Sequence, residues 1–129
     1  MDCGPTCLKM IANYYGIDFC VGDMKNIDRI AYEGSSILDL MDAAKKIGLA
    51  STVLEIDINL INMVVLPVIL YWKKHHFVVL FKIKRNFYFI ADPSKGALKL
   101  SKTDFSNGLQ NQLSNDRCSG ILMTLSVIA

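Results

Sequence analysis

The sequence lacks a long apolar segment. Its longest apolar run, residues 63–72, has 10 residues and contains Pro67, whereas a helix that crosses a membrane needs roughly 20. Near the start, Asp2, Gly4 and Pro5 interrupt the apolar stretch that a signal peptide requires. We therefore expect the chain as given to be soluble, with no export signal of its own.

An excess of one charge is also missing. The formal net charge is +2, and the 14 Lys and Arg residues are scattered along the sequence rather than gathered in a run. This distribution argues against a nucleic-acid-binding surface, so no nucleic-acid partner is expected. Apolar residues, in contrast, are plentiful: with 129 residues, of which 52% are hydrophobic, the chain can fill the core of one domain.

A dense disulfide framework is missing, because the spacing of the cysteines fits none. The four cysteines are Cys3, Cys7, Cys20 and Cys118. We expect all four to be reduced, and all except Cys3 to be small buried apolar side chains. Cys3 and Cys7 could bind zinc together with His75 or His76, but the second close pair of ligands that strong zinc motifs have is missing. No metal and no cofactor are therefore predicted.

Cys3 differs from the other cysteines in its position. It stands directly before Gly4-Pro5, and Pro is favoured at the first position of a helix. Apolar residues then recur at helical spacing up to Tyr15, and Gly16 is a typical left-handed cap. A helix N-terminus favours an anion and therefore the reactive thiolate. Cys3 is thus a candidate nucleophile, although a cysteine in such a position is more often structural.

The first 48 residues are predicted to be helical and the rest to be mainly strands. Ser36 and Asp39 form a capping box before the third helix, which Gly48 ends. The predicted helices are 5–15, 21–31 and 37–47, with short helical turns at 57–63 and around Phe105. The predicted strands are 51–56, 67–72, 76–83, 87–92, 98–100 and 121–128, and 107–119 is predicted to be loop. Helices followed by strands indicate an α+β domain with an antiparallel sheet.

Two of the predicted strands bring a possible base and a possible orienting carboxylate together. The only histidines, His75 and His76, stand at the start of one strand, and Asp92 ends the next. A hairpin centred on Lys84 would place His76 directly opposite Asp92, with Cβ atoms about 4.5–5.5 Å apart on one face. A register slip by one residue would offer His75 instead, so the spacing alone leaves this choice open. Considered singly, such a histidine is usually a half-buried polar residue, and an Asp before Pro is usually a turn.

Cys3, one of the histidines and Asp92 would together make the arrangement that acyl transfer through a thioester requires. It consists of a nucleophile, a base and a group that holds the base. The cysteine comes from the helical half and the histidine from the sheet half. The site is therefore predicted to lie in the cleft between the two halves.

Several segments resemble motifs of the bacteriocin-processing peptidases, the double-glycine-leader peptidase domains fused to ABC exporters. They cover essentially the whole chain and follow one another in the same order and spacing as in that family. The cysteine motif corresponds to 2–16 (DCGPTCLKMIANYYG), a Gly-Ser-Ser segment to 34–36 with Leu38, the histidine motif to 66–72 (LPVILYW) with 76–80 (HFVVL), the aspartate motif to 90–93 (IADP) with Gly96, and an acidic-Phe pair to 104–105.

The resemblance implies a papain-like fold, in which a helical half (1–48) packs on a mainly sheet half (49–129) of a single peptidase domain. It implies a cysteine endopeptidase that cuts after Gly-Gly or Gly-Ala and removes the leader of a bacteriocin-like precursor during export. Cys3 would be the nucleophile, His76 the base and then the acid, and Asp92 the group that orients His76. The resemblance thus selects His76 over His75.

The same resemblance implies partners and a location. The partners would be the leader-bearing precursor peptide and the transmembrane and ATPase domains of a longer ABC exporter. The domain would work on the cytoplasmic side of the bacterial inner membrane as part of that exporter, and would be soluble in isolation.

The chain departs from the family pattern at one point. The family usually has a glutamine a few residues before the cysteine, which helps form the oxyanion hole, and only Met1 and Asp2 precede Cys3 here. One missing oxyanion donor typically costs about 10²–10³ in rate, although the backbone N–H of Cys3 can still donate. Two other functions share parts of the pattern. A non-cleaving module that binds leader or cargo typically lacks the cysteine, and another papain-like acyl transferase or amidase would need a different substrate cleft.

Overall fold

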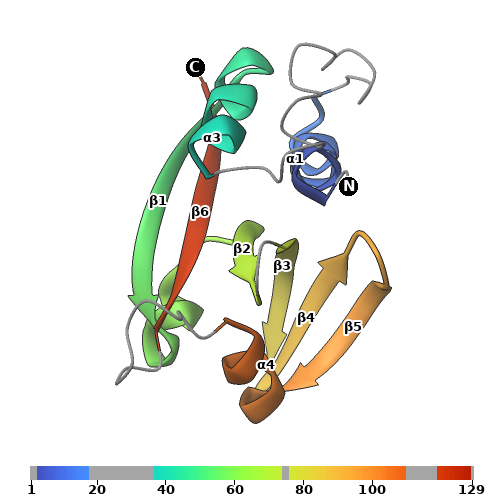
Figure 1. The fold of residues 1–129 in the computed structure, drawn as a ribbon, viewed down its shortest axis with the longest axis vertical. Coiled ribbons are helices and arrows are strands. Elements are labelled where there is room, and N and C mark those ends of the chain that lie inside the picture. The colour runs from blue at the N-terminus through green and yellow to red at the C-terminus, as the bar shows by residue number, and fades with distance from the viewer. Residues whose placement is uncertain (1–2, 18–36, 74–75, 110–118, 129) are drawn as a thin grey trace.

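A six-stranded sheet forms the centre of the computed structural model, which describes residues 3–17, 37–73, 76–109 and 119–128. The strand order is β1-β6-β2-β3-β4-β5, so the strand that is last in sequence lies between the first two (Figure 1). All five neighbouring pairs are antiparallel, which confirms the α+β prediction. The strands are β1 (Leu49–Asp57), β2 (Val68–Trp72), β3 (His76–Lys84), β4 (Phe87–Asp92), β5 (Gly96–Ser101) and β6 (Ser119–Val127).

Helix α1 (Cys3–Tyr14) begins at the candidate nucleophile and packs against β3. Cys7 and Ile11, which are four residues apart, are fully buried together with Leu8 on one side of the helix. The helix ends before Gly16, whose φ of +76° is the left-handed conformation expected of a C-terminal cap. Burial of this apolar side holds the start of the helix, and therefore Cys3, against the sheet.

Helix α3 (Ile37–Lys46) packs against β1 on the same face of the sheet as α1. It buries Leu40, Ala43 and Ala44, and it is followed by Gly48 with a φ of +94°. The end of this helix therefore agrees with the sequence prediction. Its predicted cap, Ser36, and the predicted helix at 21–31 lie outside the described residues.

Two clusters of buried side chains cover the two faces of the sheet. Because successive side chains of a strand point to opposite faces, Phe77 and Val79 belong to the cluster under α1 and α3, whereas Val78 and Leu80 belong to the other. The second cluster is covered by the 3₁₀ helix η2 (Ile58–Met63) and by α4 (Lys102–Leu109). Asp57 caps η2 as predicted, since its Oδ1 accepts a 2.8 Å hydrogen bond from the N–H of Asn59.

The loop predicted for residues 107–119 is wrong at both ends. Helix α4 continues to Leu109, and β6 already begins at Ser119, while residues 110–118 lie outside the described part. The polar sequence of α4 concealed the helix, which depends on burial of Phe105 and Leu109 against the sheet. None of the described helices is long and apolar enough to cross a membrane.

Candidate active site

The first two components of the site are joined at one end of the β3–β4 hairpin. His76 opens β3 and Asp92 closes β4, and Nε2 of His76 lies 2.8 Å from Oδ1 of Asp92. The carboxylate is nearly buried, with 4% of its side chain exposed, whereas the imidazole retains 18%. An imidazole that donates its Nε2–H to a carboxylate has its Nδ1 lone pair left as a base. The structure therefore brings these two predicted residues together. His75 lies outside the described residues.

The register that produces this contact is not the predicted one. The hairpin closes through Arg85 and Asn86, both with positive φ, and Lys84 pairs with Phe87 rather than standing at the centre. Near the site Val79 pairs with Ala91, so the position opposite Asp92 is residue 78 and His76 is its diagonal neighbour. The prediction of a directly opposed pair was therefore wrong by two residues, an even shift that leaves both side chains on one face.

A bulge in β3 is the reason why the two residues share a face. The register changes between Leu80 and Lys82, so Phe81 is an extra residue without a partner on β4. If the pairing of Lys84 with Phe87 continued without this bulge, residue 79 would face Asp92, and His76 would point to the opposite side. The bulge thus restores the facing of His76 that the two-residue turn alone would reverse.

Ser94 is a site residue that the sequence reasoning missed. Its backbone N–H and its Oγ–H both donate to Oδ1 of Asp92, at 2.8 and 2.7 Å, so this one oxygen accepts three hydrogen bonds with that of His76. The turn after β4 is closed by a further bond from the N–H of Lys95 to the carbonyl of Asp92. A signal was present, because Asp followed two residues later by a donor is typical of an Asx turn.

These contacts determine the charge state of Asp92. Burial acts to raise the pKa of the carboxyl, but the hydrogen bonds from the His76 and Ser94 side chains and from the Ser94 backbone outweigh it. The pKa of Asp92 is therefore lower than its ordinary value of 3.8. At neutral pH the group is a carboxylate, which can orient a neutral imidazole and stabilise an imidazolium.

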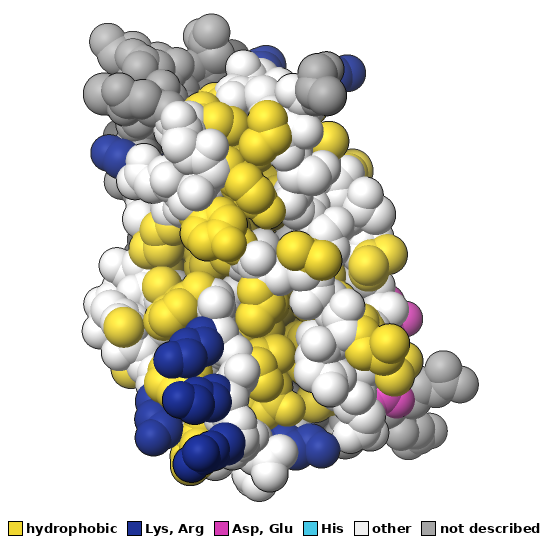
Figure 2. All heavy atoms as spheres, turned by 180° about the vertical axis from the view of Figure 1, so that it is seen from behind, with side chains coloured by type: hydrophobic (Ala, Val, Ile, Leu, Met, Phe, Trp, Pro, Cys, Tyr) yellow, Lys and Arg dark blue, Asp and Glu magenta, His cyan; other side chains and the backbone are white. Residues whose placement is uncertain are grey.

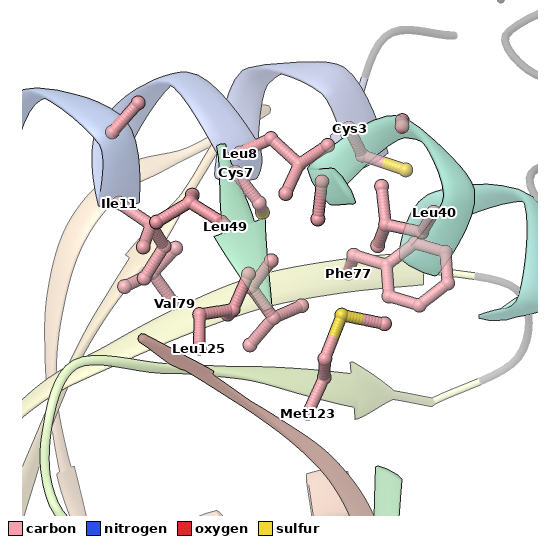
Figure 3. Close-up of a cluster of buried hydrophobic side chains, with 14 residues drawn as sticks. Cys3, Cys7, Leu8, Ile11, Leu40, Leu49, Phe77, Val79, Met123 and Leu125 are labelled. Carbon is pink, nitrogen blue, oxygen red and sulfur yellow. The ribbon is translucent and has the colours of Figure 1, made fainter. Parts of the chain in front are cut away.

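Cys3 lies in helix α1, which packs against the strand that His76 opens. It is the first residue of α1 and is 9% exposed, so the prediction of a cysteine at a helix start is confirmed. Figure 3 shows its sulfur near Leu40 of α3, above Phe77 of β3. Cys3 and Phe77 belong to the same buried cluster, and Phe77 follows His76 directly in the chain.

Cys7 lies one helical turn after Cys3 and is more deeply buried. It is fully buried, as predicted, and its burial raises the pKa of its thiol well above the ordinary value of 9.0, with further contributions from negative charge on Cys3 and on Asp92. Cys7 is a neutral apolar side chain at pH 7, so only Cys3 of this pair can serve as a thiolate nucleophile.

Trp72, the last residue of β2, supports the neighbouring strand β3, which His76 opens. It is paired with His76 across β2 and β3, and its ring packs against Phe105 with centroids 5.6 Å apart. Gly108 makes this packing possible, because a Cβ at that position would lie 2.1 Å from the Trp72 ring. In addition, the N–H of Lys73 donates to the carbonyl of Gly108 at 2.8 Å. Helix α4 thus fixes the end of β2 beside the histidine.

Curated relatives are similar in sequence to most of this chain. The colicin V secretion/processing ATP-binding protein of Escherichia coli is 29% identical over 105 residues, which are 81% of this chain and 15% of that protein. The pediocin PA-1 transport/processing ATP-binding protein of Pediococcus acidilactici is 30% identical over 113 residues, which are 81% of this chain and 16% of that protein. The chain therefore spans about one sixth of the length of these relatives.

Solved structures share the fold. A double-glycine-motif protease from an AMS/PCAT transporter, crystallised with its leader peptide, superposes with a TM-score of 0.83 at 25% identity, covering 97% of this chain and 84% of that one. The peptidase domain of Streptococcus ComA, a bifunctional ABC transporter of a quorum-sensing pathway, gives a TM-score of 0.82 at 25% identity, covering 98% and 91%. These likenesses confirm the papain-like fold.

The family assignment rests on most of the chain. Residues 1–113 match the model of the Peptidase C39 family, and this range contains all three residues of the predicted triad. The fold and the family agree with the resemblance found in the sequence motifs. The chain therefore belongs to the Peptidase C39 family and is a cysteine peptidase domain.

Proposed function

We propose that this domain removes a double-glycine-type leader from a bacteriocin-like precursor peptide, with Cys3 as nucleophile, His76 as base and acid, and Asp92 as the orienting group. The observation that carries the proposal is the 2.8 Å contact between His76 Nε2 and Asp92 Oδ1 beside a helix that begins at Cys3. This contact leaves the other ring nitrogen for the thiol, as the general logic of a nucleophile, base and orienting group requires.

Acylation is the first half of the proposed reaction. Nδ1 of His76 takes the thiol proton, and Sγ of Cys3 attacks the carbonyl carbon of the last leader residue. The carbonyl oxygen becomes an oxyanion, which the backbone N–H of Cys3 can stabilise, because N–H groups in the first turn of a helix have no partner within it. The C–N bond then breaks as the His76 imidazolium gives its proton to the leaving amine, the new N-terminus of the cargo.

Deacylation completes the cycle. The leader is now held as a thioester on Cys3, and water attacks the thioester carbonyl while Nδ1 of His76 accepts a water proton. The C–S bond breaks, the leader leaves with a free carboxyl group, and the proton returns to the thiolate. Throughout, the Asp92 carboxylate keeps Nε2–H in place and stabilises the imidazolium.

We propose that the leader binds over a small apolar depression that includes Phe77. The depression lies between one face of the sheet and the start of α3. Its lining residues include Ile37, Val53, Tyr71, Phe77, Ile121 and Met123. Phe77 and Cys3 belong to the same buried cluster, so a helix bound here would end close to the proposed nucleophile. An amphipathic leader helix would bind by placing its apolar side in this depression.

A second apolar hollow offers a matched control. It has a volume of about 430 Å³ and lies between α3 and the ends of β1 and β6, with Leu38, Met41 and Ile128 among its lining residues. None of the proposed triad lines it. We therefore expect Val53→Asp to raise KM for a full-length leader substrate at least tenfold with little change in kcat, and Leu38→Asp to change neither. Equal effects of the two variants would contradict the leader-binding assignment.

Cleavage by the 129-residue chain tests the catalytic proposal. The substrate is a peptide with an amphipathic leader ending in Gly-Gly, and mass spectrometry locates the cut. We expect Cys3→Ala to abolish cleavage and Cys7→Ala to retain it, because Cys7 is buried and stays protonated. Cleavage that persists in Cys3→Ala would overturn the mechanism. Binding of the leader without any cleavage by the unmodified chain would instead favour the alternative, a non-cleaving cargo-binding module.

The proposed setting is an ABC exporter. The named relatives are secretion or transport proteins with an ATP-binding function, and this chain corresponds to about one sixth of their length. We infer that the chain is the single peptidase domain of such an exporter and acts on the cytoplasmic side of the bacterial inner membrane. Its partners there are the transmembrane and ATPase domains. An open reading frame that continues into both would support this setting.

A further inference from the structure

A group of basic and aromatic side chains covers the turn end of the β3–β4–β5 strands, which we call the basic corner. It consists of Phe81, Lys82, Lys84, Phe87, Phe89 and Lys99. The strand register places its members side by side, because Lys84 pairs with Phe87, and Phe89 pairs with Lys82 on one side and with Lys99 on the other. Paired residues in an antiparallel sheet share a face.

Five of the six side chains of the basic corner contact another member, and all except the half-buried Phe89 are exposed to solvent. The Lys82 ammonium lies 5.2 Å from the centre of the Phe89 ring, and the Lys99 ammonium lies 4.3 Å from that of Phe87. Phe81 and Phe89 are 6.4 Å apart between ring centres. Phe81 and Phe87 are 43% and 40% exposed, so large apolar rings are presented outward between cations.

Acidic groups are nearly absent from this part of the chain. Residues 58–103 contain eight of the 14 Lys and Arg residues but only one of the 12 Asp and Glu residues. That one is Asp92, which is buried and already accepts three hydrogen bonds. Figure 2 shows Lys and Arg side chains gathered among apolar ones at one corner of this face, with the visible acidic side chains at the opposite edge. Cations scattered in sequence are thus gathered in space, which the sequence analysis did not anticipate.

We propose that the basic corner docks the domain onto an anionic lipid bilayer. Lysines near a membrane surface are attracted by acidic headgroups, and aromatic rings between them can enter the interfacial region while the lysine stems lie along apolar surface. The rings project from a sheet face, which suits a broad planar partner. The bilayer is within reach if the domain belongs to an exporter, and in this respect the inference rests on the proposed function.

Docking through the basic corner would leave the candidate active site open. Strand β3 runs from His76 at the site to Lys84 at the turn, and eight steps along a strand span roughly 25 Å. The histidine and Asp92 therefore lie at the other end of the hairpin from its most basic part. A bound membrane would orient the domain without covering the triad.

Vesicle co-sedimentation of the 129-residue chain tests this proposal. We expect binding to phosphatidylcholine vesicles that contain phosphatidylglycerol, weaker binding as salt is raised, and little binding to pure phosphatidylcholine. The variant Lys82→Gln/Lys99→Gln should bind about 25-fold more weakly, since each lysine near an anionic surface contributes about fivefold. Unchanged binding by this variant, or equal binding to both kinds of vesicle, would overturn the proposal.

Matched controls distinguish lipid docking at the basic corner from a general effect of positive charge. Lys45→Gln/Lys46→Gln removes the same charge from the exposed end of α3 and should change vesicle binding less than threefold. Tighter binding to polyglutamate or to single-stranded RNA than to anionic vesicles at the same salt would instead identify a polypeptide or nucleic-acid surface, and would overturn the proposal. The Lys82→Gln/Lys99→Gln variant should cleave a soluble leader peptide normally, so a failure of docking is distinguishable from a failure of the peptidase function.

Discussion

The two ends of the β3–β4 hairpin differ in burial and in charge. At one end, His76 and Asp92 form a 2.8 Å contact around a carboxylate that is 4% exposed. At the other, Lys82 lies over the Phe89 ring, and Lys99 of the neighbouring strand β5 lies over the Phe87 ring. Phe81, the bulged residue, stands between the two ends.

The difference shows which end of the hairpin has a fixed side-chain arrangement and which end tolerates movement of its side chains. A buried carboxylate that accepts three donors has one favourable arrangement, because losing any donor leaves a polar group without its partner. Cation–π contacts at an exposed surface contribute only about 0.5–1 kcal/mol and tolerate movement. The hairpin thus combines a rigid end suited to orienting a base with an adaptable end suited to contact with a partner.

Removing the carboxylate should have the largest effect on this comparison. We expect Asp92→Ala to lower kcat about 10- to 100-fold, because the hydrogen bond that holds His76 to a charged group contributes about 1.5–3 kcal/mol. The free energy of unfolding should fall by about 1–3 kcal/mol, since both Ser94 donors also lose their acceptor. Steady-state cleavage and urea unfolding measure the two effects.

The conservative variant gives the control for this prediction. Asp92→Asn keeps an oxygen that can accept the Nε2–H of His76, so it should recover most of the kcat that Asp92→Ala loses. If both variants were equally inactive, the negative charge rather than the orientation of the ring would be essential. If both were fully active, Asp92 would have no part in the mechanism.

Lowering the pH should remove the contribution that the Asp92 carboxylate makes to the free energy of unfolding. The pKa of Asp92 is lower in the folded protein than its ordinary value of 3.8, so its carboxylate adds to the free energy of unfolding above that pH. The contribution is lost as the pH falls through the lowered folded pKa. The stability difference between the unmodified chain and Asp92→Asn should therefore be full at pH 7 and shrink below about pH 4. A constant difference across this range would contradict the assigned ionisation.

Loss of the Ser94 hydroxyl should lower kcat less than loss of the Asp92 carboxylate, because Ser94 acts only by holding Asp92 in place. Ser94→Ala removes the 2.7 Å Oγ donor but keeps the backbone N–H donor at 2.8 Å. We expect a fall in kcat of about tenfold or less with KM unchanged, as for loss of one of several hydrogen bonds to a charged group. Ser94→Thr retains the hydroxyl and should restore the rate. A change in KM alone would indicate a contact with substrate rather than positioning of Asp92.

Local sequence patterns predicted most of the elements and the members of the site. Helical spacing after Cys3, glycines at positions 16 and 48, and Val-rich runs gave helices and strands close to those observed. The order of the histidines and Asp92 at strand ends also predicted that Asp92 meets a histidine, although it left the choice between His75 and His76 open and the resemblance selected His76. These features depend on residues that are near one another in sequence.

The register of the β3–β4 hairpin and the packing around it could not be predicted in this way. The bulge at Phe81 depends on which face of β3 each residue buries against α1 and α4, and no local pattern records that choice. Helix α4 was underestimated for the same reason, because its fit on Trp72 depends on the missing side chain of Gly108. Likewise, the basic corner exists only after three strands align Lys82, Phe89 and Lys99.

The smallest effect should come from the exposed end of the hairpin. Lys99→Gln removes the ammonium that lies 4.3 Å from the Phe87 ring centre, and exposed contacts of this kind contribute about 0.5–1 kcal/mol. We expect the free energy of unfolding to fall by less than about 1 kcal/mol and cleavage to stay within twofold of normal. A large loss of activity would mean that the two ends of the hairpin are coupled through β4, because Lys99 is paired with Phe89 and not with Asp92. The charge could then not be removed without disturbing the triad, and the separation of a rigid end from an adaptable end would fail.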